Sequence, residues 1–220
     1  MNGISLNGRI NTNKKYYLLL IDIKKSTRMR ASTRKKIFHK LKSKIEELNK
    51  TLSPKPLIEL TINYGDEIAG LFETPSPFYH IISELREAIY PEAAFRFVAG
   101  YGRIGMPSTD LREVGGEVFK QANECMRRLK AQDNFCAWSL KDKEENLILN
   151  SLVEMSNTLL QRMTAYQHQV YLLLKAGMSQ KKISEELSKY PQSVSNAIKR
   201  GASDQVIRAE RVIHRMLEKY

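Results

Sequence analysis

The sequence has few cysteines and no long apolar run. Only Cys125 and Cys136 occur among 220 residues, which is too few for a disulfide framework or a four-ligand zinc site. The longest apolar run, 16–21, has strand length, whereas a membrane-spanning helix needs about 20 residues. The polar, basic N-terminus contains no apolar signal region. We therefore expect a reduced, cytoplasmic protein with no membrane partner.

What the sequence does have is apolar residues and positive charge. Its hydrophobic fraction of 42% excludes general disorder, and its length predicts one large or two small domains. Lys and Arg number 36 against 24 Asp and Glu, a net charge of +12. Residues 151–220 hold 11 basic and 6 acidic residues (net +5), so this part is the more basic per residue. The balance indicates a polyanionic partner.

A basic run covers residues 24–50, with eleven Lys or Arg and two Glu. Apolar residues recur within it at helical spacing: Ile37, Leu41, Ile45 and Leu48. Lysines cover the remaining helix faces. The run is either the solvated face of an amphipathic helix or a surface that faces phosphates, and the sequence leaves both interpretations open.

The patterns along the first part predict an α+β domain. Strands are expected at 16–23, 57–63, 67–72, 94–101 and 134–140, and helices at 31–50, 75–90 and 116–130. Tyr64-Gly65-Asp66 is expected to form a tight hairpin turn. The first six elements match the ferredoxin-like βαββαβ pattern, an antiparallel sheet with helices on one face. We expect this domain over residues 1–145.

Residues 146–220 are expected to form an all-α domain that contains a helix-turn-helix. Helices are predicted at 164–176, 180–188, 192–200 and 204–219, with Lys189-Tyr190-Pro191 breaking the chain between the second and third. In such a motif the second short helix enters the major groove of DNA. The partner expected from this pattern is double-stranded DNA.

The third helix of this domain carries the candidate DNA contacts. Val194 and Ile198 would anchor it from behind, and residues 192–200 include no acidic side chain. We assign contacts with base edges to Gln192, Ser193, Ser195 and Asn196, and contacts with phosphates to Lys199 and Arg200. A homodimer is expected, because single modules gain affinity by pairing half-sites. The alternative is a helical bundle for protein contact, such as an adaptor for acidic proteins.

This segment resembles the tail domains of sigma factors and LuxR-type regulators. The resemblance rests on MSQKKIS at 178–184 and SVSNAI at 193–198. It implies DNA binding and identifies no DNA sequence.

Two short stretches of the first domain carry acidic residues, LLIDIKKST at 19–27 and GDEIAGLF at 65–72. Asp22 lies near the end of an expected strand and Asp66 in the hairpin turn beside it, so the two carboxylates could converge. Such a pair suits Mg²⁺ when phosphates complete its shell. The structural alternative is that Asp66 caps the turn and backbone donors satisfy Asp22. Both remain open.

These stretches, with RFVAGYG at 96–102, resemble class III nucleotidyl cyclases. The resemblance implies that Asp22 and Asp66 are metal ligands. It also implies that the loop containing Ile23, Ser26 and Thr27 faces a triphosphate, with Mg²⁺ and a nucleotide as candidate ligands. No cofactor is expected to be required.

The chain departs from the cyclase pattern where that family carries Val-Asn-x-Ala-Ala-Arg. Here 118–123 reads VFKQAN, with Phe119 in place of the Asn and Asn123 in place of the Arg. Arg127 and Arg128 lie one helical turn further on and would require another register. Each missing transition-state donor typically costs roughly 10²–10³ in rate. We therefore assign no catalytic residue and do not expect cyclase activity.

A cyclase-like half followed by a helix-turn-helix resembles the SatD family of bacterial proteins. The match runs through YLLLIDI at 17–23, TI-x-x-GDE at 61–67 and RF-x-x-G-x-G at 96–102. The resemblance implies a DNA-binding or regulatory role. We expect a transcriptional regulator whose first domain dimerises or senses a nucleotide. The alternative is an Mg²⁺-dependent enzyme that binds nucleoside triphosphates.

Overall fold

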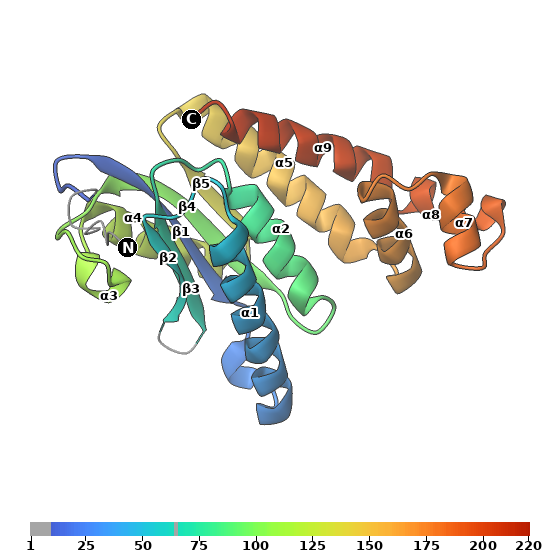
Figure 1. Ribbon diagram of the computed structural model, residues 1–220, viewed down its shortest axis with the longest axis horizontal. Helices are drawn as coiled ribbons and strands as arrows, with labels where there is room; N and C mark the ends of the chain where they lie inside the picture. The colour runs from blue at the N-terminus through green and yellow to red at the C-terminus, as the bar shows by residue number, and fades with distance from the viewer. Residues whose placement is uncertain (1–9, 64–65) are drawn as a thin grey trace, which may run out of the picture. The chain divides into compact units, whose positions relative to one another are not determined.

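The computed structural model describes residues 10–63 and 66–220 (Figure 1). Its strands are β1 (Lys15–Ile23), β2 (Ile58–Asn63), β3 (Glu67–Phe72), β4 (Phe95–Arg103) and β5 (Cys136–Ser139). Its helices are η2 (Ser26–Arg28), α1 (Ala31–Thr51), α2 (Phe78–Ile89), α3 (Leu111–Val114), α4 (Glu117–Gln132), α5 (Lys143–Arg162), α6 (Ala165–Lys175), α7 (Gln180–Glu186), α8 (Pro191–Arg200) and α9 (Ser203–Leu217). The chain is thus a mixed α+β protein.

The five strands form one sheet in the order β2-β3-β1-β4-β5. β1 is antiparallel to both β3 and β4, and β5 adds to the edge parallel to β4. The order of the first four strands is the one that the βαββαβ pattern predicts. The expected turn residues Tyr64 and Gly65 lie outside the described residues.

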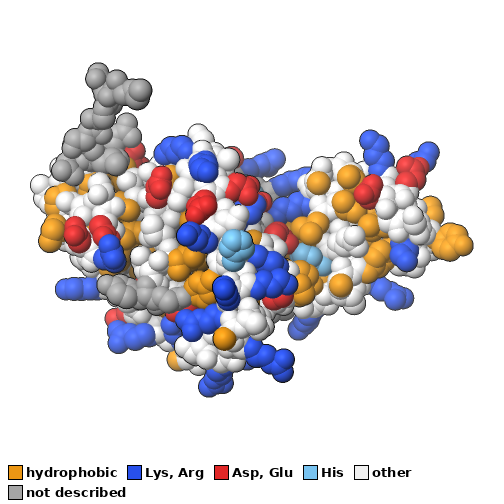
Figure 2. Space-filling model, turned by 60° about the horizontal axis from the view of Figure 1, so that its bottom comes forward, with side chains coloured by type: hydrophobic (Ala, Val, Ile, Leu, Met, Phe, Trp, Pro, Cys, Tyr) orange, Lys and Arg blue, Asp and Glu red, His pale blue; other side chains and the backbone are white. Residues whose placement is uncertain are grey.

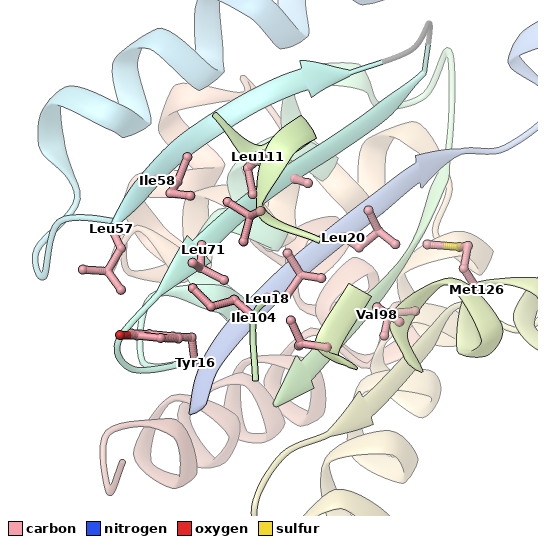
Figure 3. Packing of buried hydrophobic residues seen from close by; sticks show 14 of the residues in the cluster. Tyr16, Leu18, Leu20, Leu57, Ile58, Leu71, Val98, Ile104, Leu111 and Met126 are labelled. Atoms are coloured by element: carbon pink, nitrogen blue, oxygen red, sulfur yellow. The ribbon is translucent and has the colours of Figure 1, made fainter. Parts of the chain in front are cut away.

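Strand alternation divides the sheet into two buried faces. On the first, Leu18, Leu20 and Val98 pack against Val118 and Met126 of α4 (Figure 3). On the second, Phe72 of β3 meets Phe78 of α2 with ring centroids 5.1 Å apart. α1 and α2 therefore share one face, as expected, and α4 covers the other (Figure 1).

Apolar periodicity explains why these helices form where they do. The residues predicted to line α1, namely Ile37, Leu41, Ile45 and Leu48, are all buried. On α4, Val118, Ala122, Met126 and Leu129 form the buried stripe. A buried methylene contributes roughly 0.8 kcal/mol, so these stripes hold the helices to the sheet.

The chain divides into two compact units. The first comprises residues up to Asn150 together with Met216–Tyr220, and the second is Ser151–Arg215. The division lies inside α5, five residues after the expected boundary. The start of α5 belongs to the first unit because Asn150 accepts a hydrogen bond from the Trp138 backbone N–H (2.9 Å), and Asn146 from that of Leu140 (2.8 Å).

The second unit is entirely helical. Thr164 begins α6 with a capping box that Gln167 completes, and the Ser179 hydroxyl accepts from a backbone N–H in the first turn of α7. Val170, Ile183, Val194, Ala197 and Ile198 form a common core of α6, α7 and α8. The four predicted helices are therefore present, with ends that differ by one or two residues. Among all described residues, no helix is both long and apolar enough to cross a bilayer.

Candidate functional site

Asp22 occupies the end of β1 on the α4 face of the sheet. The strand register places Glu67 of β3 opposite it on one side and Arg96 of β4 on the other. Its side chain is nine-tenths buried, and its Oδ1 lies 2.6 Å from the Lys130 ammonium of α4. A lysine side chain therefore meets this carboxylate.

Asp66 lies in the turn directly before β3, as expected, and faces the segment that follows β1. Its carboxylate accepts a hydrogen bond from the buried Ser26 hydroxyl, and its backbone carbonyl accepts from the Ile23 N–H (3.3 Å). Thr27, the neighbour of Ser26 in η2, is exposed. The two aspartates thus lie on adjoining segments, but each carboxylate has its own partner within the protein.

Glu67 is a member of this site that the sequence interpretation did not identify. Burial raises its pKa, and the negative charges of Asp22 and Asp66 raise it further, while Lys130 opposes them. Alternation of side chains along the strand at 67–72 could have identified Glu67, because it places Glu67 on the same face of the sheet as Asp22. Three carboxylates consequently influence one another at this end of the sheet.

Asp133, directly after α4, connects two basic residues at the same end of the sheet. Its Oδ1 lies 2.9 Å from the Lys24 ammonium and 3.3 Å from the Arg96 guanidinium. These contacts, led by the hydrogen bond from Lys24, lower the pKa of Asp133. The network ties the end of β1 and the start of β4 to the end of α4.

The two carboxylates that the cyclase resemblance implies as metal ligands both have partners within the protein. Within 10–63 and 66–220, no group of three His, Cys, Asp or Glu side chains is placed to hold a metal ion. Lys130 already neutralises Asp22, and Ser26 binds Asp66. A metal ion at these two carboxylates would have to compete with Lys130 and Ser26, and we derive no chemistry through a metal.

The α4 residues weighed against the cyclase pattern lie as follows. Phe119 packs partly buried against the core beside Val118, and Asn123 and Arg127 are exposed. The Arg128 guanidinium lies 3.1 Å from the Cys125 sulfur and 3.6 Å from a Glu124 oxygen. Arg128 is thus held against its own helix.

Three lysines of the basic run on α1 pair with acidic residues of neighbouring segments. Glu92 binds Lys36 and Lys40 at 2.9 and 3.0 Å, and Lys44 lies 3.1 Å from Glu84. Hydrogen bonds from Lys36 and Lys40 lower the pKa of Glu92 to about 2. These pairs account for Lys36, Lys40 and Lys44, and both interpretations stay open for the exposed Lys35, Lys42 and Lys50.

The predicted DNA contacts share one surface of α8. Gln192, Ser193, Asn196, Lys199 and Arg200 are exposed and Ser195 is half-buried. Val194 and Ile198, the predicted anchors, are 0% and 3% exposed. Gln192 Nε2 donates to Asn196 Oδ1 one turn along the helix (3.3 Å). Lys and Arg side chains project from the part of the second unit that holds α7 and α8 (Figure 2).

Comparisons with known proteins were made for the whole sequence. Among solved structures, 23 chains match, including a bacterial light-regulated adenylyl cyclase with 15% identity, a TM-score of 0.39, and coverage of 56% of this chain and 74% of that chain. No curated protein matches. A family model described as the SatD family matches residues 16–217. Because that match spans most of the 220 residues, the chain belongs to the SatD family.

Proposed function

We propose that the protein is a cytoplasmic DNA-binding regulator that reads duplex DNA through a helix-turn-helix formed by α7 and α8. The observation that carries this proposal is the surface of α8. Its polar side chains face outward at Gln192 and Asn196, while Val194 and Ile198 hold the helix from behind. Gln and Asn are the usual bidentate readers of adenine in the major groove.

Positive charge around this surface supports contact with phosphates. Lys199 and Arg200 are exposed at the end of α8. Further exposed lysines lie at the start of α7, at Lys181 and Lys182, and before α8, at Lys189. Each phosphate that a lysine or arginine neutralises releases counterions, which makes the affinity depend on salt.

The regulatory part of the proposal is a homodimer on paired half-sites. A single short helix contacts few base pairs, and pairing of half-sites is how such modules gain affinity and specificity. The first unit would then serve to dimerise the protein or to sense a nucleotide.

Selection of duplexes from a random-sequence pool tests the function directly. The full chain at low salt should enrich a common sequence, and its affinity should fall as salt rises. Absence of salt-sensitive binding to any duplex would refute the proposal. Binding to an acidic protein instead of DNA would favour the adaptor interpretation.

A second candidate function is binding of a nucleoside triphosphate with Mg²⁺ at Asp22 and Asp66. The hydrogen bond from Ile23 N–H to the Asp66 carbonyl favours it, because it brings the two segments together. Lys130 disfavours it by occupying Asp22. Calorimetry with ATP or GTP decides: Mg²⁺-dependent heat that Asp66→Asn abolishes would support the second candidate, and no heat would remove it.

A further inference from the structure

Two tyrosines form a stacked pair at the end of the sheet where β1 begins. Tyr17 of β1 lies directly opposite Tyr101 of β4 in the strand register, so both rings project from the same face. Their centroids are 4.6 Å apart with an interplanar angle of 29°. Tyr17 is buried, whereas Tyr101 is half-buried. Tyr101 is therefore the ring of the pair that a ligand can reach.

A third tyrosine, Tyr220, closes the side of this pair. Its ring meets Tyr17 edge to face, with centroids 5.9 Å apart, and its hydroxyl donates to Glu145 at the start of α5 (2.5 Å). Burial raises the pKa of Tyr17 to about 12 and that of Tyr220 above its usual value. Both hydroxyls therefore stay neutral near pH 7.

These rings line a cleft of about 540 Å³. Its other walls are Lys141 and Asp142, just before α5, and Lys219 beside Tyr220. Every lining residue belongs to the first unit. The volume lies within the range of small-molecule sites, roughly 300–1,000 Å³, and the cleft has no residue in common with the Asp22 and Asp66 site.

The two carboxylates of the cleft are already used within the protein. Asp142 Oδ1 accepts from the Glu145 N–H (2.9 Å), and Glu145 binds Tyr220 and lies 3.7 Å from the Lys219 ammonium.

The ammonium groups around the cleft are less engaged. Lys15 lies over the Tyr101 ring, 5.5 Å from its centroid. In the part of the chain that the structure describes, neither Lys15 nor Lys141 has an ion-pair partner within 4 Å.

We propose that this tyrosine cleft binds a planar aromatic anion, such as a mononucleotide or an aromatic carboxylate. The aromatic ring stacks on Tyr101, and Lys15 moves from that ring to meet the anionic group together with Lys141. Lys15, Lys141 and Lys219 outnumber Asp142 and Glu145, so the charged side chains around the cleft are net positive. The proposal does not depend on DNA binding or on a metal ion.

Calorimetry on the full chain without divalent metal tests the proposal. The probes are AMP, salicylate and ribose 5-phosphate. Saturable binding of AMP identifies a nucleotide site, and binding of salicylate alone identifies an aromatic carboxylate site. Ribose 5-phosphate should bind more weakly than either, because it cannot stack. No binding of AMP or salicylate at roughly 1 mM, or ribose 5-phosphate binding as tightly as both, overturns the proposal.

Variants separate this cleft from adventitious binding. Tyr101→Leu should weaken binding roughly tenfold, because leucine has no aromatic face on which the ligand ring can stack. Tyr190→Leu, at a tyrosine 83% exposed in the second unit, should have no effect.

Lys141 is exposed, so Lys141→Ala should not disturb folding. The control is Lys143→Ala, at another exposed lysine. Only the first should weaken binding, and the loss should shrink at high salt. Equal effects of the members of either variant pair would contradict the assignment.

Discussion

The carboxylate of Asp22 and the ammonium of Lys130 lie 2.6 Å apart and join the end of β1 to α4. Asp22 is nine-tenths buried, whereas half of the Lys130 side chain is exposed. Lysine is therefore the mobile partner of the pair, and a competing cation would have to displace it. The acidic side chains at this end of the sheet are therefore held by contacts with basic side chains, such as that between Asp22 and Lys130.

Glu67→Gln should increase stability at neutral pH. The pKa of Glu67 is raised in the folded state, so folding favours its protonated form, and that advantage is lost as pH rises through the folded pKa. At pH 7 we expect the variant to gain up to about 1 kcal/mol, limited by solvent screening. Urea unfolding at pH 7 and pH 4 measures this, and the gain should vanish at pH 4.

The control for Glu67 is Glu59→Gln, because Glu59 is exposed on β2. It should leave stability unchanged at both values of pH. A loss of stability in Glu67→Gln at pH 7 would mean that attraction to Lys130 outweighs burial and carboxylate repulsion.

Glu92→Gln should have the opposite pH dependence. The pKa of Glu92 is lowered to about 2 by Lys36 and Lys40, so its contribution is present above the ordinary value near 4.5 and is lost as pH falls toward 2. The variant should lose about 1 kcal/mol or less at pH 7, because the pair is partly exposed. Unfolding in low and high salt checks this; a loss that salt does not reduce would exclude an ion-pair origin.

Ile198→Ala should destabilise the second unit through its core. Ile198 is 3% exposed and packs with Val194, Ile183 and Val170. Truncation of a buried isoleucine to alanine typically costs 2–5 kcal/mol. Thermal unfolding followed by circular dichroism measures the loss, with the exposed neighbour Lys199→Ala as control. Equal stability of the two variants would show that α8 is not held by this core.

Asn196→Ala and Lys199→Ala should affect DNA binding in different ways. The first should relax preference at one base position, at a cost of about 1–3 kcal/mol for the preferred sequence. The second should weaken binding to all duplexes and reduce the salt slope by about one. Competition binding against the selected sequence and its single-base variants measures both. The groove assignment fails if Asn196→Ala weakens every duplex equally.

Local patterns were sufficient for most of the helices and strands and for the order of the first four strands. The stripe from Ile37 to Leu48 predicted α1 to within one residue of its end, because burial of every third or fourth side chain is what stabilises an amphipathic helix. The short segments η2 and α3 were not predicted, since four residues or fewer carry no periodicity. No helix was predicted with the bounds of α5 either. The sequence also did not predict where the first unit ends, because helix α5 continues through the boundary without a break.

By itself, the sequence determined which faces of its helices and strands are apolar, and hence that Val194 and Ile198 turn inward while Gln192 and Asn196 turn outward. Only the tertiary structure decided that Asp22 meets Lys130, that Asp66 meets Ser26, and that Tyr17, Tyr101 and Tyr220 share one cleft. The physical reason is that periodicity is a local property, while the partner of a side chain depends on strand register and on where a distant helix docks.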